Sequence, residues 1–187
     1  MFEHDLTDPH DVGLNAERLA AIPQYFKENY LDTGKLPCVA TLVSRGGEVA
    51  LEDYSGTTHL GEGEPIGPHT IFRIYSMTKP VTSLAAMMLF EEGRLRLDHE
   101  LARYIPEFEN VQVFDSGNRE DYTTRAPDRP ITLLDLFTHT SGITYGFLMQ
   151  DEPDAIYRKE KIGAPTETLL EMSQRIAKLP LAFSPGT

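Results

Sequence analysis

The sequence predicts one globular domain that mixes helices with an antiparallel β-hairpin, the α/β (α+β) fold class. Of the 187 residues, 40% are apolar and 25% are charged, a balance typical of a single globular domain. Residues 38–54 hold two β-rich runs joined across Arg45-Gly46-Gly47, which predicts a hairpin. Residues 81–90 are apolar at every position except Thr82 and Ser83, which predicts a helix buried on all faces.

Charge and cysteine content narrow the range of partners and compartments. Lys and Arg total 17 against 29 Asp and Glu, and the formal charge of −12 repels phosphate backbones and anionic membrane surfaces. We therefore expect no nucleic-acid or membrane partner. The one cysteine, Cys38, cannot form an internal disulfide and is expected as a small buried strand residue. The acidic N-terminus shows no apolar signal segment, which favours a cytoplasmic protein and leaves periplasmic or secreted locations open.

The N-terminal third is expected to contain a helix before the hairpin and a turn-rich connection after it. Asn15 is placed to cap a helix whose apolar residues recur at spacings of three and four, with Gly34 just past its end. Pro23 within that helix predicts a kink or a late start. Residues 55–70 are rich in Gly and Pro and are expected to form turns.

Farther along the chain, two breaks separate the expected elements. Gly93 is placed to end the apolar helix. Residues 109–130 are polar and without a period, so we expect a surface loop. A last helix is expected to begin at a Thr166 cap and to end before Pro180.

A short helix is predicted after the pair Thr132 and Asp135, which has the spacing of a capping box. It is expected to stop at His139-Thr140-Ser141-Gly142. A histidine beside two hydroxyls invites comparison with a catalytic triad, but the pattern favours a helix-ending turn with Gly142 at positive φ.

Ser76-Met77-Thr78-Lys79 matches the S-x-x-K pattern at the start of the apolar helix. Positions i and i+3 share a helix face, so the Ser76 hydroxyl and the Lys79 ammonium are within reach of each other. Desolvation and the positive end of the helix dipole disfavour the charged form of Lys79, and a neutral amine can take the proton of Ser76. The helix N-terminus would also direct backbone N–H groups at the resulting oxyanion.

The alternative is that Ser76 is a helix N-cap and Lys79 a surface lysine. Pro80 biases the preceding residue away from the α region, so an irregular first turn is expected.

Other common site types are missing from the sequence. No serine lies in G-x-S-x-G, no Gly-Lys-Ser/Thr closes a P-loop, and the glycines at 61 and 63 lack the third glycine of a dinucleotide fingerprint. The six histidines show no ligand spacing. We expect no metal site and no cofactor.

Three segments together, residues 72–82, 89–95 and 131–142, resemble the serine β-lactamase-related family. This family includes class C β-lactamases, D-alanyl-D-alanine carboxypeptidases and esterases, and the resemblance runs from about Leu14 to Thr187. It implies a β-lactamase/transpeptidase-like fold, with an antiparallel sheet flanked by helices, a helical subdomain and an active site in the cleft between them. By resemblance, Ser76 is the acylated nucleophile, Lys79 is its activating partner and Tyr145 lines the substrate pocket.

The resemblance also implies that residues 1–187 are the N-terminal portion of a single β-lactamase-like domain. Residues 1–75 would supply the first helix and hairpin, and residues 76–187 the nucleophile helix and helical subdomain. The family's Tyr-x-Asn and Lys-Thr-Gly-type motifs do not occur in the 187 residues. We therefore expect a longer polypeptide, and no turnover from these residues alone.

The function expected from the resemblance is that of a serine hydrolase acting through an acyl-enzyme. Its partner would be a small-molecule ester, β-lactam or peptide-like amide, with esters favoured, and the oligomeric state is left open. The alternative is a non-catalytic β-lactamase-like binding or regulatory module.

Overall fold

The computed structural model describes residues 5–163 and 166–187. It divides the chain into two compact units, Met1–Ile74 and Tyr75–Thr187. Both units combine helices with antiparallel strands, so the predicted fold class is confirmed. Over the described residues, none of the helices has the length and apolar character needed to cross a bilayer.

The first unit is built on the predicted hairpin, extended by a third strand. Strands β1 (Cys38–Arg45), β2 (Glu48–His59) and β3 (Glu62–Pro65) pair antiparallel in the order β1-β2-β3. The residues between β1 and β2 are Gly46 and Gly47, with φ values of 63° and 94°. Glycine adopts positive φ without a side-chain clash, so this pair suits the two-residue turn that matches strand twist.

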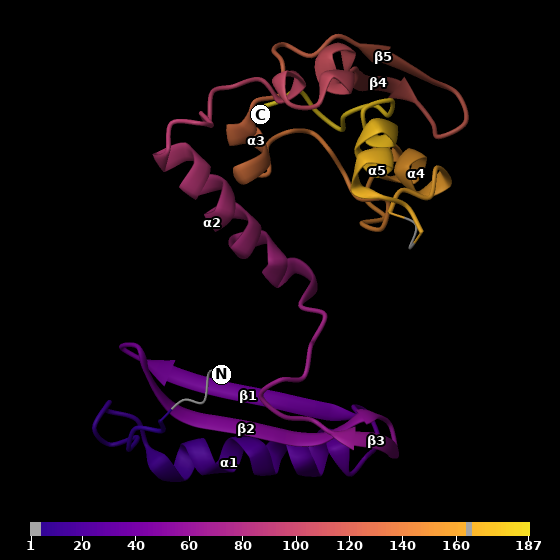
Figure 1. The fold of residues 1–187 in the computed structure, drawn as a ribbon. Coiled ribbons are helices and arrows are strands. Elements are labelled where there is room, and N and C mark those ends of the chain that lie inside the picture. The colour runs from indigo at the N-terminus through magenta and orange to yellow at the C-terminus, as the bar shows by residue number, and fades with distance from the viewer. Residues whose placement is uncertain (1–4, 164–165) are drawn as a thin grey trace. The chain divides into compact units, whose positions relative to one another are not determined.

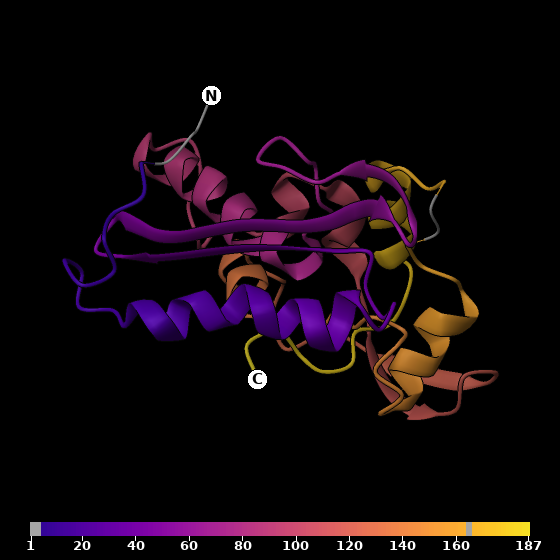
Figure 2. The ribbon, with the colours of Figure 1, turned by 90° about the horizontal axis from the view of Figure 1, so that it is seen from below.

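Helix α1 (Ala16–Phe26) runs along the strands of this sheet (Figures 1 and 2). The Asn15 side chain accepts a hydrogen bond from the Arg18 backbone N–H at 2.9 Å, which confirms the predicted cap. The buried residue of α1 is Leu19. Pro23 lies inside the helix, so a late start is wrong, and a π-helical segment (Lys27–Leu31) follows directly.

Two expectations for the first unit are corrected. The stretch after residue 55 is not only turns, because β2 continues to His59 and pairs with β3. Gly56 explains the difference: its φ is 93°, and a Cβ there would overlap the Pro37 carbonyl oxygen. The glycine thus permits a close strand approach instead of a turn. Cys38 lies in a strand as expected, but it is half-buried and not fully buried.

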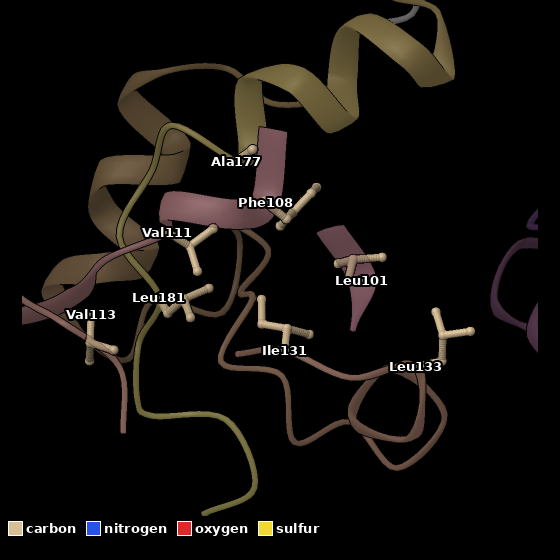
Figure 3. Packing of buried hydrophobic residues seen from close by; sticks show 8 residues of the cluster. All are labelled: Leu101, Phe108, Val111, Val113, Ile131, Leu133, Ala177 and Leu181. Carbon is tan, nitrogen blue, oxygen red and sulfur yellow. The ribbon is translucent and has the colours of Figure 1, made fainter. Parts of the chain in front are cut away.

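The second unit holds four α-helices and a small hairpin among its described residues. These are α2 (Thr78–Glu91), α3 (Leu133–Phe137), α4 (Glu152–Lys159), α5 (Leu169–Ile176), β4 (Val113–Gly117) and β5 (Tyr122–Arg125). Its core is drawn from segments far apart in sequence, as Figure 3 shows for the eight clustered residues Leu101, Phe108, Val111, Val113, Ile131, Leu133, Ala177 and Leu181.

The surface loop expected over 109–130 is wrong in its centre, where β4 and β5 form an antiparallel hairpin. The cause is a contact with a distant part of the chain. The Phe114 N–H donates to the Leu181 carbonyl at 2.9 Å, and the Leu181 N–H donates to the Gln112 carbonyl at 2.8 Å. Val113 is thereby fixed in the core beside Leu181, which no local pattern in 109–130 indicates.

Two helix predictions in this unit are also corrected. The last helix is capped by Thr168 and not by Thr166, because Thr168 forms a reciprocal capping box with Glu171 three residues later. Helix α4 was not predicted. Its signal is present in the sequence, since Asp151 caps it, Pro153 lies in its first turn and Asp154 follows the cap by three residues.

The prediction that the apolar helix is buried is wrong, because α2 contains no buried residue. Val81, Leu84 and Met88 lie at helical spacing and are 63%, 65% and 55% exposed. A helix buries an apolar face only where another element packs against it. The α2 residues Thr78, Lys79, Thr82 and Ser83 instead line the cavity described below. The predicted end of the helix is confirmed, since Gly93 takes φ 69° two residues beyond Glu91.

The exposed apolar residues of α2 give a first testable prediction. Residues 1–187, expressed alone, are expected to self-associate, because monomeric soluble proteins rarely expose contiguous apolar patches of this kind. Size-exclusion chromatography with light scattering measures this directly. The double substitution Leu84→Glu and Met88→Glu is expected to restore a monomer. A monomeric wild-type segment with a cooperative thermal melt would contradict the prediction.

Candidate active site

Ser76 and Lys79 lie together where the second unit begins. A 3-10 turn (Tyr75–Met77) precedes α2, so the irregular first turn expected from Pro80 lies just before the helix. The Lys79 Nζ donates a hydrogen bond to the Ser76 Oγ at 3.0 Å. The predicted pairing of hydroxyl and amine is confirmed. The N-cap position of α2 is Met77, so the alternative that Ser76 caps this helix is wrong.

The backbone immediately before the serine is strained. Tyr75 takes φ 45°, in the left-handed region that a bulky residue rarely adopts. Such conformations cost about 1–3 kcal/mol and concentrate at functional sites, where the surrounding structure enforces them. The strain supports a site that presents the Ser76 hydroxyl, which is exposed.

A cavity of about 640 Å³ lies beside this pair. Lys79 and Tyr145 both line it, so the structure brings these two predicted residues to one cavity. Ser76 does not line it but is hydrogen-bonded to Lys79, which does. The desolvation expected for Lys79 is not observed, because Lys79 is exposed. The remaining lining residues are Thr78, Thr82, Ser83, Leu136, Phe137, His139, Ser141, Ile143, Thr144, Leu148, Gln150, Asp151, Ala182 and Phe183.

One wall of the cavity is the turn that follows α3. His139 and Gly142 take φ values of 60° and 81°, so the predicted helix-ending turn is confirmed. A Cβ on Gly142 would overlap the Phe183 carbonyl oxygen, and the Ala182 N–H donates to the Gly142 carbonyl at 2.7 Å. The glycine therefore lets the C-terminal segment pass close enough to place Ala182 and Phe183 in the cavity wall.

Asp135 fixes the start of α3, the helix that precedes this turn. It is 2% exposed and completes the predicted capping box with Thr132. Arg129 donates two hydrogen bonds to its carboxylate, both at 2.7 Å, and the Thr140 hydroxyl donates a third at 3.2 Å. Hydrogen bonding from Arg129, opposed by burial, holds the pKa of Asp135 well below its ordinary range.

The loop that carries Tyr145 is organised by a residue that the sequence analysis did not identify. Asp154 on α4 is fully buried, and its carboxylate accepts hydrogen bonds from the backbone N–H groups of Gly146, Leu148 and Met149. Tyr145 itself packs on Phe147, with ring centroids 4.9 Å apart. The sequence could have revealed Asp154 through the cap pattern of α4, in which Asp154 follows the Asp151 cap by three residues. That pattern does not show which backbone N–H groups Asp154 binds.

Within residues 5–163 and 166–187, no group of three or more His, Cys, Asp or Glu side chains is arranged to hold a metal ion. The groups that lie together at the start of α2 are the Ser76 hydroxyl, the Lys79 amine and the N-terminus of the helix. The positive end of a 14-residue helix would stabilise negative charge placed beside Ser76.

Comparison with known proteins decides the family. The family model described as Beta-lactamase matches residues 24–187. This chain belongs to the beta-lactamase family. The beta-lactamase match covers the Ser76 and Lys79 pair, the turn at Gly142 and the loop of Tyr145.

Among the relatives of this beta-lactamase-family chain, Protein Rv1367c of Mycobacterium tuberculosis is 36% identical over 155 residues, 83% of this chain and 38% of the relative. Esterase EstB of Burkholderia gladioli is 30% identical over 184 residues, 96% of this chain and 44% of the relative. The solved structure of EstCE1, described as a hydrolase with promiscuous acyltransferase activity, aligns with a TM-score of 0.72 at 26% identity, over 92% of this chain and 43% of that chain. The chain thus spans less than half the length of these relatives.

Proposed function

We propose that the protein is a serine hydrolase that forms an acyl-enzyme on Ser76. The observation that carries the proposal is the 3.0 Å hydrogen bond between Lys79 Nζ and Ser76 Oγ at the start of α2. A nucleophile within hydrogen-bond reach of its base is the arrangement that covalent catalysis requires.

The reaction balances with these two groups. Lys79 in its neutral form accepts the Ser76 proton while Oγ bonds to the substrate carbonyl carbon. The oxyanion that forms is stabilised by the nearby N-terminus of α2. Its collapse breaks the bond to the leaving group, which takes the proton back from Lys79. A water molecule then attacks the acyl-enzyme and releases the acid and Ser76.

Esters are the favoured substrate class. The cavity beside Lys79 has apolar walls, such as Leu136 and Phe183, interspersed with hydroxyls, such as Thr82 and Ser83. That lining suits an uncharged acyl group next to a polar carbonyl. The name of one relative, Esterase EstB, supports the same class.

Labelling with a fluorophosphonate, followed by peptide mapping of the full-length protein, tests the nucleophile. We expect one adduct, on Ser76, and none in a Ser76→Ala variant. Ser141, the buried serine in the cavity wall, is the internal control because it should stay unlabelled. An adduct on Ser141 would refute the assignment, and no adduct at all would favour the non-catalytic binding module.

A further inference from the structure

We propose that Asp154 is a positioning residue that holds loop 145–151 as a wall between two neighbouring cavities and so limits the length of the acyl group that the site accepts. This inference rests on the proposed function. It concerns the loop that carries Tyr145, and Asp154 itself is buried and lines neither cavity.

The first step is the anchor. Asp154 Oδ1 accepts from the Gly146 N–H at 2.7 Å and the Leu148 N–H at 3.1 Å, while Oδ2 accepts from the Met149 N–H at 2.9 Å. Arg158, one turn along α4, adds a charged donor to Oδ2 at 2.8 Å. An ionised carboxylate only accepts hydrogen bonds, so it suits four converging donors. Burial alone would raise the pKa of Asp154, but these hydrogen bonds outweigh it and lower the pKa.

The second step is that the loop conformation needs such an anchor. Gly146 has φ 89°, and a Cβ there would lie 2.9 Å from the Arg158 backbone nitrogen. Met149 has φ 58°, a conformation that an unbranched L-residue adopts only at a cost. Both residues are bonded to the Asp154 carboxylate, and Arg158 also donates to the Gly146 carbonyl at 3.2 Å. The strained backbone is thus held from α4.

The loop formed by residues 145–151 lies between two cavities. A second cavity, of about 960 Å³, lies beside the first and shares Gln150, Asp151 and Ala182 with it. Leu148 lines only the first cavity and Met149 only the second. The other residues of the second cavity are Phe114, Asn118, Arg119, Glu120, Glu152, Pro153, Ala155 and Arg158.

Consecutive residues of one loop therefore form the partition, and Asp154 bonds to both the Leu148 and Met149 amides. With the loop fixed, an acyl group attached to Ser76 is confined to the first cavity. With the loop released, the two cavities join across Gln150 and Asp151, and a longer acyl chain fits.

The test is Asp154→Asn in the full-length protein, because the asparagine NH₂ cannot accept a hydrogen bond from a backbone N–H. Sites are counted by fluorophosphonate labelling of Ser76, and kcat/KM per labelled site is measured for p-nitrophenyl octanoate and p-nitrophenyl acetate. We expect the octanoate-to-acetate ratio to rise at least fivefold. A variant that only lost folded protein would keep the wild-type ratio, and a ratio within twofold of wild type would overturn the proposal.

Glu167→Gln is the matched control. Glu167 is also a buried carboxylate paired with an arginine, Arg175, and it accepts from the backbone N–H of Gly163, but it lines neither cavity. Its ratio should stay at the wild-type value. If Asp154→Asn does not fold, Arg158→Met removes one donor and leaves the carboxylate. Because Arg158 also lines the second cavity, a rise in the ratio then counts as support only together with faster exchange of the Gly146, Leu148 and Met149 amides, and a rise without it overturns the anchor.

Hydrogen exchange of the Gly146, Leu148 and Met149 amides tests the anchoring by Asp154 independently of catalysis, because it needs no substrate. Faster exchange of these amides in Asp154→Asn supports the anchor, and unchanged exchange overturns it. If wild-type Ser76 is never labelled, the proposed function fails, and the claim about acyl length fails with it even where exchange supports the anchor.

Discussion

Replacing Lys79 with alanine is expected to slow acylation of Ser76 by a factor of about 10² or more, because the transition state loses its proton acceptor. Lys79 is exposed, and its side chain is hydrogen-bonded to Ser76 Oγ, so folding should be unaffected. The burst of p-nitrophenol from an ester, or the rate of fluorophosphonate labelling, measures the acylation step. Circular dichroism and the thermal melt check that the variant remains folded.

Lys79→Arg separates a general base from a positive charge. A guanidinium retains its proton throughout the accessible pH range, so this variant should lose acylation as Lys79→Ala does. If the arginine variant acylates at close to the wild-type rate, Lys79 acts only by its charge, and the proton-transfer step proposed above is incorrect.

The Ser76 and Lys79 pair could be predicted from the sequence because its geometry is local. Three residues along a helical turn bring the two side chains within 3.0 Å, whatever the rest of the fold does. The Asn15 cap, the Gly46-Gly47 turn and the Thr132 capping box are of the same kind. Each depends on the chemistry of two or three neighbouring residues.

The features that were missed depend on partners that a local pattern does not specify. The β4 strand is fixed by main-chain bonding to Leu181, more than 60 residues later in the sequence. The exposure of α2 depends on what packs against it, whereas the sequence shows only that its residues are apolar. The role of Asp154 depends on positive φ at Met149, which no residue preference indicates.

Asp135 carries the largest effect on stability that we expect from a single side chain. Asp135→Ala removes the reciprocal cap of α3 and leaves the bidentate partner Arg129 without its carboxylate. Loss of a helix cap and of buried charged hydrogen bonds should together lower the free energy of unfolding by about 3 kcal/mol, measured by urea denaturation. A loss below about 1 kcal/mol would mean that the network around Asp135 is not needed for stability.

The control for burial is Asp98→Asn. Asp98 also accepts two hydrogen bonds from one arginine, Arg96, which lower its pKa to about 2, but its side chain is 67% exposed. Solvent screening weakens such a pair, so the urea midpoint should not change measurably. An effect as large as that of Asp135→Ala would mean that ion pairing, not burial, determines the cost.

The contribution of Asp135 should also depend on pH in a predictable direction. Its pKa in the folded protein lies below the ordinary value of about 3.9 that it takes when unfolded. Folding therefore favours the ionised form, and the stabilisation is fully present above the unfolded pKa and is lost as the pH falls toward the folded pKa. The difference in unfolding free energy between wild type and Asp135→Ala should be constant from pH 7 to 5 and should shrink below about pH 4. Urea denaturation at pH 7, 5, 4 and 3 measures it. A difference that stays constant down to pH 3, or grows, would show that the carboxylate charge of Asp135 is not what stabilises the start of α3.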